Sequence, residues 1–340
     1  PEKELQAEVS APAGAQSGPQ PRCGTLTTYE LPGVTPGAVA VEEDGSVWFT
    51  DPKAGALGHM TVAGKVTRRF ISAQLSQLVR APNGDLWGID RGGNSVWQIS
   101  PGKEPRRHPV PTATGREGAG SGGPYGSGLS DIAVGAGGNV WFVETEADKV
   151  GRITPDGQIT EVPLFGPGDG YLRPSSLSPA PDGSVWVSAP LGRRIVRVDG
   201  RTLAIRNVTV PHPGGTVIAH SLAVGPGGDV WFGRPSPSAM EPAGPSPALG
   251  RRRPDGSLAY HVLPGGGRRE PGALTAGPDG AIWFLDAPAG TLGRMAADGT
   301  LTEFALSGGM YDSLGGRQLA AGADSVWFAQ PGRLGRISCR

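Results

Sequence analysis

A tryptophan-containing phrase that recurs seven times constrains the fold of this 340-residue chain more than any other feature. Each copy reads as an aliphatic run, a glycine-rich turn and a second run that carries tryptophan, as in IAVGAGGNVWF at 132–142 and LTAGPDGAIWF at 274–284. Successive copies lie 39 to 54 residues apart. The repeated residues are Trp48, Trp87, Trp141, Trp186, Trp231, Trp283 and Trp327. Repetition at this period indicates an array of equivalent units.

Each unit continues into a second pair of apparent strands, seen in KVGRITPDGQITEVPL at 149–164 and TLGRMAADGTLTEFAL at 291–306. The tips carry Asp-Gly, Asn-Gly or Gly-Gly, residues that accept the positive φ of tight hairpin turns. No window has a helical hydrophobic period. The sequence therefore predicts an all-β protein, a single seven-bladed β-propeller with four antiparallel strands per blade and the tryptophans packed between blades.

The two ends of the chain are expected to close the ring together. The last unit ends at 333–340 after three strands, and TLTTYEL at 25–31 matches the outermost strand TLTEFAL at 300–306. We predict that the N-terminal strand completes the last blade, which removes an open sheet edge. This alignment sets Cys23 beside Cys339 and predicts a disulfide, with two packed free thiols as the alternative. Residues 23–340 then form the propeller, and 1–22, which has no apolar signal-peptide core, is expected to be a disordered tail.

Composition excludes several classes of partner. The chain has 31 basic and 31 acidic residues, so bulk charge gives no reason to expect nucleic acid or an anionic membrane as partner. No apolar run approaches the ~18 residues of a membrane helix. A disulfide is typical of oxidising compartments. We therefore expect a secreted or extracytoplasmic monomer, its leader removed, that takes a small-molecule or peptide ligand.

The repeated phrases resemble the streptogramin B lyase (virginiamycin B lyase) family, most clearly at 141–165 and in outline over 23–340. The resemblance implies a seven-bladed propeller and a Mg²⁺-dependent elimination that opens a cyclic depsipeptide at its ester bond without water. The family's two histidines and two glutamates would fall on Gly272, Arg317, Gly315 and, for the last, Gln330 or Pro331. All four are substituted here, which leaves the ligands of Mg²⁺ unmatched and argues against streptogramin B cleavage.

The remaining candidates lie on the face where the long loops emerge. His220, in AHSLAVG at 219–225, has the strand position of the family's histidines one blade earlier, and we take it as the best proton carrier. Glu144 and Arg317 are the other candidate catalytic residues, the arginine favouring a carboxylate. Glu144 and Asp286 are candidates for a cation. The long loops contribute candidate substrate-binding residues, namely Tyr125, Tyr171, Arg173, Tyr311 and Asp312.

Each of these candidates has a structural alternative. Acidic residues that follow the tryptophan-containing strands often accept hydrogen bonds from backbone N–H groups of the next loop. A histidine just before a strand often has only a structural role, as a hydrogen-bond partner of a loop. The preferred hypothesis is a streptogramin-lyase-like propeller that binds, or acts as a lyase or hydrolase on, a small cyclic, ester-containing or acidic molecule at the top of the channel. A non-catalytic extracellular recognition propeller is the alternative. A six-bladed lactonase-type propeller is disfavoured by the count of seven repeats.

Overall fold

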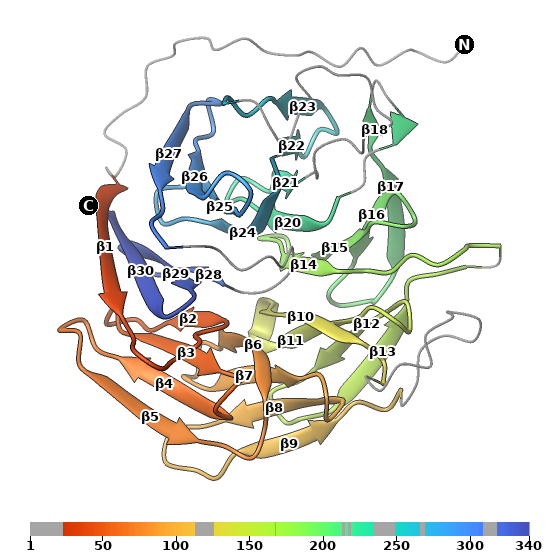
Figure 1. Ribbon diagram of the computed structural model, residues 1–340. Coiled ribbons are helices and arrows are strands. Elements are labelled where there is room, and N and C mark those ends of the chain that lie inside the picture. Colours follow the sequence, from red (N-terminus) through yellow and green to blue (C-terminus); the bar gives the residue numbers. More distant parts are fainter. Residues whose placement is uncertain are drawn as a thin grey trace, which may run out of the picture.

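The computed structural model describes residues 23–112, 126–166, 168–212, 215–216, 219–233, 249–265, 269–308 and 318–339. Within these residues the chain forms seven four-stranded antiparallel sheets arranged around a common centre (Figure 1). The only other elements described are the 3-10 helix η1 (Ala136–Gly138) and a hairpin of β18 (Pro211–His212) and β19 (Gly215–Thr216). The predicted seven-bladed, four-stranded propeller is confirmed.

The first four blades each use four consecutive strands, from the channel outward. Blade 1 holds β2 (Val39–Val41), β3 (Val47–Asp51), β4 (Ala56–Met60) and β5 (Val66–Phe70). Blade 2 holds β6 (Leu75–Arg80), β7 (Leu86–Asp90), β8 (Ser95–Ile99) and β9 (Arg106–Pro109). Blade 3 holds β10 (Leu129–Val134), β11 (Val140–Glu144), β12 (Lys149–Ile153) and β13 (Ile159–Pro163). Blade 4 holds β14 (Ser176–Pro179), β15 (Val185–Ala189), β16 (Arg194–Val198) and β17 (Ile205–Thr209).

The last three blades follow the same order, except that the seventh borrows its outer strand. Blade 5 holds β20 (Ser221–Val224), β21 (Val230–Gly233), β22 (Leu249–Arg252) and β23 (Leu258–His261). Blade 6 holds β24 (Pro271–Ala276), β25 (Ile282–Asp286), β26 (Thr291–Met295) and β27 (Leu301–Ala305). Blade 7 holds β28 (Leu319–Ala321), β29 (Ser325–Gln330), β30 (Arg333–Cys339) and then β1 (Cys23–Glu30).

Ring closure is as predicted. β1, in red, lies beside β30, in blue, and the two pair antiparallel from Cys23↔Cys339 to Glu30↔Arg333 (Figure 1). A disulfide joins Cys23 to Cys339 across 316 residues of sequence, with their Cα atoms 3.9 Å apart. The first and last described strands are therefore linked both by a β-ladder and covalently. No helix in the described part of the chain is long and apolar enough to cross a membrane.

The core lies between the blades. Side chains alternate along each second strand, so the tryptophan faces the next blade and its two neighbours face the preceding one. Trp141 of blade 3 thus packs with Leu177 and Val187 of blade 4, whereas Phe142 of blade 3 packs with Trp87 and Ile89 of blade 2. Burial of these rings between adjacent sheets is the main apolar contact that holds the ring together.

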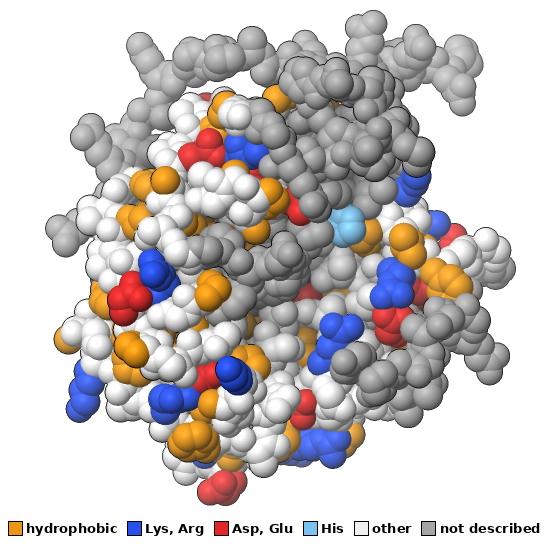
Figure 2. All heavy atoms as spheres, viewed as in Figure 1, with side chains coloured by type: hydrophobic (Ala, Val, Ile, Leu, Met, Phe, Trp, Pro, Cys, Tyr) orange, Lys and Arg blue, Asp and Glu red, His pale blue; other side chains and the backbone are white. Residues whose placement is uncertain are grey.

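Each blade presents two edges with different connections. In blade 3, Leu129 pairs with Glu144, Glu144 with Lys149 and Lys149 with Pro163. One edge therefore carries the start of the inner strand, the turn between strands two and three, and the connection to the next blade; we call this the loop face. The opposite edge, the turn face, carries the turns between strands one and two and between strands three and four. Figure 2 shows charges of both signs scattered over the described surface of one face.

Candidate functional site

Seven equivalent positions at the start of the inner strands surround the channel on the loop face. In blade 5, Leu222 of the inner strand pairs with Phe232 of the second strand. Each of the seven positions lies two residues before the residue that corresponds to Leu222 in its own blade. Six lie in the described part of the chain: Gly37, Ser76, Ser130, Ser175, His220 and Gly272. The seventh, Arg317, falls outside the described residues. Among the six, His220 is the only group that titrates near neutral pH.

His220 is held by its backbone and leaves its ring available. Its N–H donates to the carbonyl oxygen of Gly233 at 3.3 Å, and its carbonyl oxygen accepts from the hydroxyl of Ser175 at 2.8 Å. Among the described residues none hydrogen-bonds to the imidazole. Burial lowers the pKa of His220, and the negative charge of Glu270 opposes that shift. The ring is therefore mostly neutral at pH 7 and can accept a proton.

Small polar groups adjoin the histidine. The hydroxyls of Ser175 and Ser188 lie 3.1 Å apart, and the buried Ser188 hydroxyl also accepts from the N–H of Ser176 at 3.0 Å. The Ser221 hydroxyl donates to the carbonyl oxygen of Pro271 at 3.1 Å. Sequence reasoning picked out neither the serines nor Glu270, although Glu270 begins the segment EPGAL at 270–274 that contains Gly272. The repeat alignment could have found Ser175, since it has the position of His220 in the preceding blade.

Glu144 faces the interior between blades and not the channel. Glu144 lies two residues after Phe142, so its side chain points to the same side of the strand, towards blade 2, and it is fully buried. Among the described residues neither carboxyl oxygen has a hydrogen-bond partner, and the nearby Ser127 hydroxyl donates to Asn94 instead. Burial raises the pKa of Glu144 to about 8, the charge of Glu161 adds to the rise, and Lys149 opposes it. At neutral pH this group is mainly a protonated acid.

Asp286 has the same place in blade 6 but a different environment. It too is fully buried, and the Arg269 Nε donates to its carboxylate at 2.6 Å. A second nitrogen of Arg269 pairs with Glu303 of the outer strand, and the N–H of Glu270 donates to Asp286 at 3.2 Å. The Asp286 carboxylate is thus neutralised by an internal arginine and also accepts backbone N–H bonds, as the structural alternative anticipated.

The loop that links blade 3 to blade 4 is fixed at its end. The buried carboxylate of Asp148 accepts from the N–H of Arg173 at 2.8 Å and from the N–H of Leu172. The Arg173 guanidinium pairs with Glu146 through two nitrogens. Arg173 has φ +47°, which this anchoring supports. Tyr171 precedes it and is half-buried. Tyr125, Tyr311 and Asp312 lie, with Arg317, outside the described residues.

The described carboxylates on the loop face do not fit a Mg²⁺ site. Magnesium prefers ionised oxygen ligands in octahedral geometry, whereas Glu144 is buried with a raised pKa and Asp286 is occupied by Arg269. In the described ranges no group of three His, Cys, Asp or Glu side chains is placed to hold a metal ion. The structure thus brings His220 and Glu270 together at the loop-face opening of the channel, which we call the mouth. It leaves Glu144 and Asp286 between blades.

Comparison with known proteins agrees with this architecture. The virginiamycin B lyase family model matches residues 15–241 and 126–340. A virginiamycin B lyase from Nocardia farcinica (strain IFM 10152) is 34% identical over 142 residues, which is 42% of this chain and 45% of that protein. The match therefore spans less than half the length of this curated relative.

Solved structures share the fold at low identity. A catalytically inactive variant of virginiamycin B lyase from Staphylococcus aureus, solved with quinupristin and with one histidine replaced by alanine, has a TM-score of 0.73. It is 21% identical, over 92% of this chain and 99% of its own. A streptogramin B lyase structure gives a TM-score of 0.72 at 23% identity, over 93% and 98%. YCF48 bound to D1 peptide gives 0.61 at 14%, over 92% and 94%.

Proposed function

Because this chain belongs to the virginiamycin B lyase family, we propose that the mouth of its channel binds a small cyclic or ester-containing molecule and that His220 exchanges a proton with it. The observation that carries the proposal is the half-buried imidazole of His220 at the rim, where burial lowers its pKa and the charge of Glu270 opposes that shift. A neutral imidazole near physiological pH is a suitable general base.

The reaction that suits a lone base is an elimination. His220 takes a proton from the carbon next to a carbonyl group, and the electron pair of that C–H bond forms a carbon–carbon double bond. The bond between the ester oxygen and the carbon next to the deprotonated carbon breaks, and its electron pair leaves with the carboxylate. No water is consumed. Glu270 stabilises the imidazolium that forms. Arg317 is proposed to bind an anionic group, and Tyr125, Tyr171, Arg173, Tyr311 and Asp312 are proposed to contact the ligand from the loops.

The substrate is proposed to differ from streptogramin B. The family's functional positions fall on Gly272, Gly315, Arg317 and either Gln330 or Pro331, and losing a general base alone costs ~10²–10⁴-fold in rate. With Mg²⁺ present, this chain should therefore open quinupristin at least ~100-fold more slowly than the Staphylococcus aureus enzyme. Elimination leaves the mass unchanged, so the product is followed by chromatography. Equal rates would show that the active groups lie elsewhere.

Ligand binding by the wild-type chain and H220A tests the proposal directly. We expect a panel of lactones and cyclic depsipeptides to include a ligand that H220A binds more weakly, with any product formation abolished. H59Q is the matched control, because His59 hydrogen-bonds Ser46 and contacts the Trp48 ring away from the mouth. Binding sensitive to H220A without product would support the recognition alternative. Unchanged binding and turnover in H220A would refute both.

Location and oligomeric state complete the proposal. We propose a secreted monomer. The Cys23–Cys339 disulfide supports the secreted location, because such bonds persist in oxidising compartments. Fractionation of the source cells should recover the oxidised protein outside the cytoplasm. Light scattering on the purified chain should give the mass of one copy; a stable dimer would contradict the monomer.

A further inference from the structure

Six of the seven blades carry, at or near the end of the third strand, an apolar residue that packs against the tryptophan of the preceding blade. Ile153, for example, lies in one cluster with Trp87, and Met295 lies in one cluster with Trp231. The six residues are Met60, Ile99, Ile153, Val198, Met295 and Ile337. Blade 5 has Arg252 in this place, paired with Val230 as Ile153 is paired with Val140. Arg252 therefore stands where the other six blades have an apolar core residue.

A second change lies across the same blade boundary, on the outer strand of blade 4. Arg206 on β17 pairs with Arg197 on β16, which itself pairs with Trp186 on β15. Five of the other blades carry a small residue at the position of Arg206: Thr27, Thr67, Thr160, Ala259 and Thr302. Blade 2 has Arg106 there, but opposite Gln98. Only blade 4 therefore sets two arginines side by side at this level.

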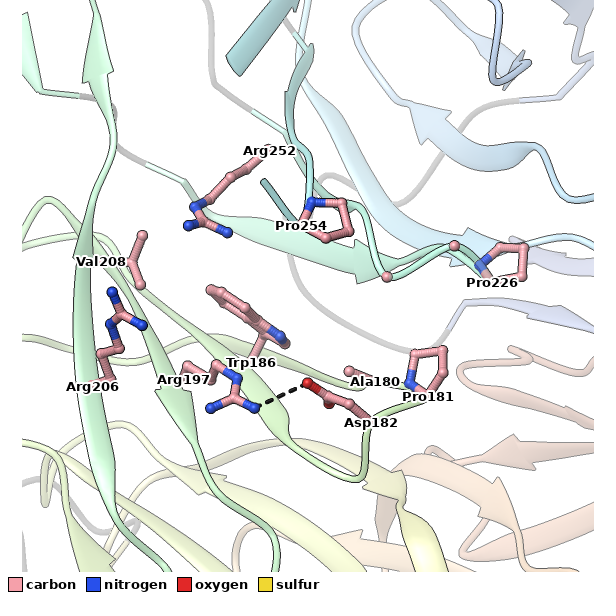
Figure 3. Close-up of a pocket in the computed structure, with 12 residues that line it drawn as sticks. Ala180, Pro181, Asp182, Trp186, Arg197, Arg206, Val208, Pro226, Arg252 and Pro254 are labelled. Carbon is pink, nitrogen blue, oxygen red and sulfur yellow. Dashed lines mark hydrogen bonds and ion pairs between the residues drawn. The ribbon is translucent and has the colours of Figure 1, made fainter. Parts of the chain in front are cut away.

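The two changes coincide with a cavity of about 370 Å³ on the turn face between blades 4 and 5 (Figure 3). Arg197, Arg206 and Arg252 line it from three different strands, with Trp186 between them. Its remaining wall is largely apolar, made by Ala180, Val208 and three prolines. A volume of this size suits a small ligand.

The charge in this cavity is unbalanced. Asp182 pairs with Arg197 at 2.9 Å, which is the only ion pair among the lining residues (Figure 3). The Arg252 guanidinium lies 5.6 Å from the Trp186 ring, and its described hydrogen bond is to a backbone carbonyl oxygen. Burial, and then the charge of Arg206, lower the pKa of Arg252; Asp255, which binds the Ser257 N–H, opposes this. Among the described residues, neither Arg206 nor Arg252 forms an ion pair with a carboxylate.

We propose that this cavity is a binding site for a small multivalent oxyanion, carrying phosphate or carboxylate groups, held by Arg206 and Arg252 with Arg197 alongside. Guanidinium forks bind both groups bidentately. An anion would neutralise the like charges that meet there. The site lies on the turn face, away from the His220 mouth, and is independent of the proposed function.

Calorimetric titration of the full chain with inorganic phosphate and with citrate, at low ionic strength, tests the site. Wild-type protein should bind at least one of them saturably, with a dissociation constant below about 1 mM. R252M and R206T install the residues that other blades carry, and each should weaken binding at least ~10-fold. R252M should melt no lower than wild type, because methionine fills this place in blades 1 and 6. Preference for phosphate or for citrate identifies the anionic group.

Two controls separate this site from others. R69T removes an exposed arginine of blade 1, and H220A alters the channel mouth; both should bind the two anions as wild type does. No saturable binding by wild type, or undiminished binding by the R206T/R252M double variant, would overturn the proposal. Loss of binding in H220A would also overturn it, by moving the anion site to the mouth.

Discussion

At the scale of single residues, a buried carboxyl group that has no hydrogen-bond partner among the described residues lowers the free energy of unfolding by an amount that depends on pH. Glu144 is fully buried, and its pKa is raised to about 8. Because the folded pKa lies above the ordinary value, the fold favours the neutral acid. The contribution of Glu144 to stability is then most favourable below pH ~4.5 and becomes less favourable as the pH rises towards 8. At pH 7 the penalty amounts to about 3 kcal/mol.

We expect E144Q to remove this dependence. A neutral amide carries no ionisation penalty, so at pH 8 the variant should unfold at a higher temperature than wild type, and the gap should close near pH 4.5. Thermal unfolding by circular dichroism across this range measures it. E104Q, at an exposed glutamate, is the control and should follow wild type. Parallel wild-type and E144Q curves across the range would show that Glu144 ionises freely.

Sequence reasoning placed Glu144 and Asp286 beside the channel, whereas the structure places them between blades. The alternation of side chains along a strand explains the observed position. Both lie two residues after a phenylalanine that faces the preceding blade, so their side chains must follow it. The partner of Asp286 could not be foreseen, because Arg269 comes from an irregular loop 17 residues away. The position of His220 at the start of an inner strand followed directly from the repeat.

At the scale of elements, five of the seven blades match a large side chain on the second strand to a small one on the third. In five blades a phenylalanine ring covers a glycine, and a Cβ on that glycine would meet the ring at 2.0 or 2.1 Å. These pairs are Phe49–Gly58, Phe142–Gly151, Phe232–Gly250, Phe284–Gly293 and Phe328–Gly335. Blade 4 instead pairs Val187 with Val196, so the combined volume at this level is conserved.

Blade 2 reverses the arrangement. Gly88 occupies the second strand and Trp97 the third, so the large residue comes from the other side. This accounts for the one tryptophan that falls outside the sequence repeat. Turn residues and the tryptophan period sufficed to predict seven four-stranded blades. The exchanged positions of the large and the small residue in blade 2 were not predictable from these features. They depend on which side chains lie opposite each other on paired strands.

We expect G293A to destabilise the protein by about 1–3 kcal/mol, because the new methyl group overlaps the Phe284 ring at 2.1 Å. Urea unfolding measures the change. G24A, whose Cβ would have no neighbour within 4 Å, is the matched control and should stay close to wild type. Adding F284L should recover part of the loss in G293A. No difference between G293A and G24A would contradict close packing at this pair.

At the scale of the whole molecule, the disulfide limits how far the unfolded chain can expand. It closes a loop across 316 residues, for which chain entropy suggests about 5 kcal/mol. The C23S/C339S variant should therefore melt roughly 5–10 °C below wild type in calorimetry. Wild type under reducing conditions should match it. An unchanged melting temperature would mean that the β1–β30 ladder alone keeps the ring closed.

The same bond turns residues 23–339 into a covalent circle, and this changes what a protease can do to the molecule. A single cut in any hairpin turn opens the circle into one linear chain with new ends, and releases no fragment of the propeller. Electrophoresis after limited proteolysis would show an intact mass until a reductant separates the two pieces. In a protease-rich setting, the first cut would leave all seven blades attached, and a second cut would be needed before any blade could leave.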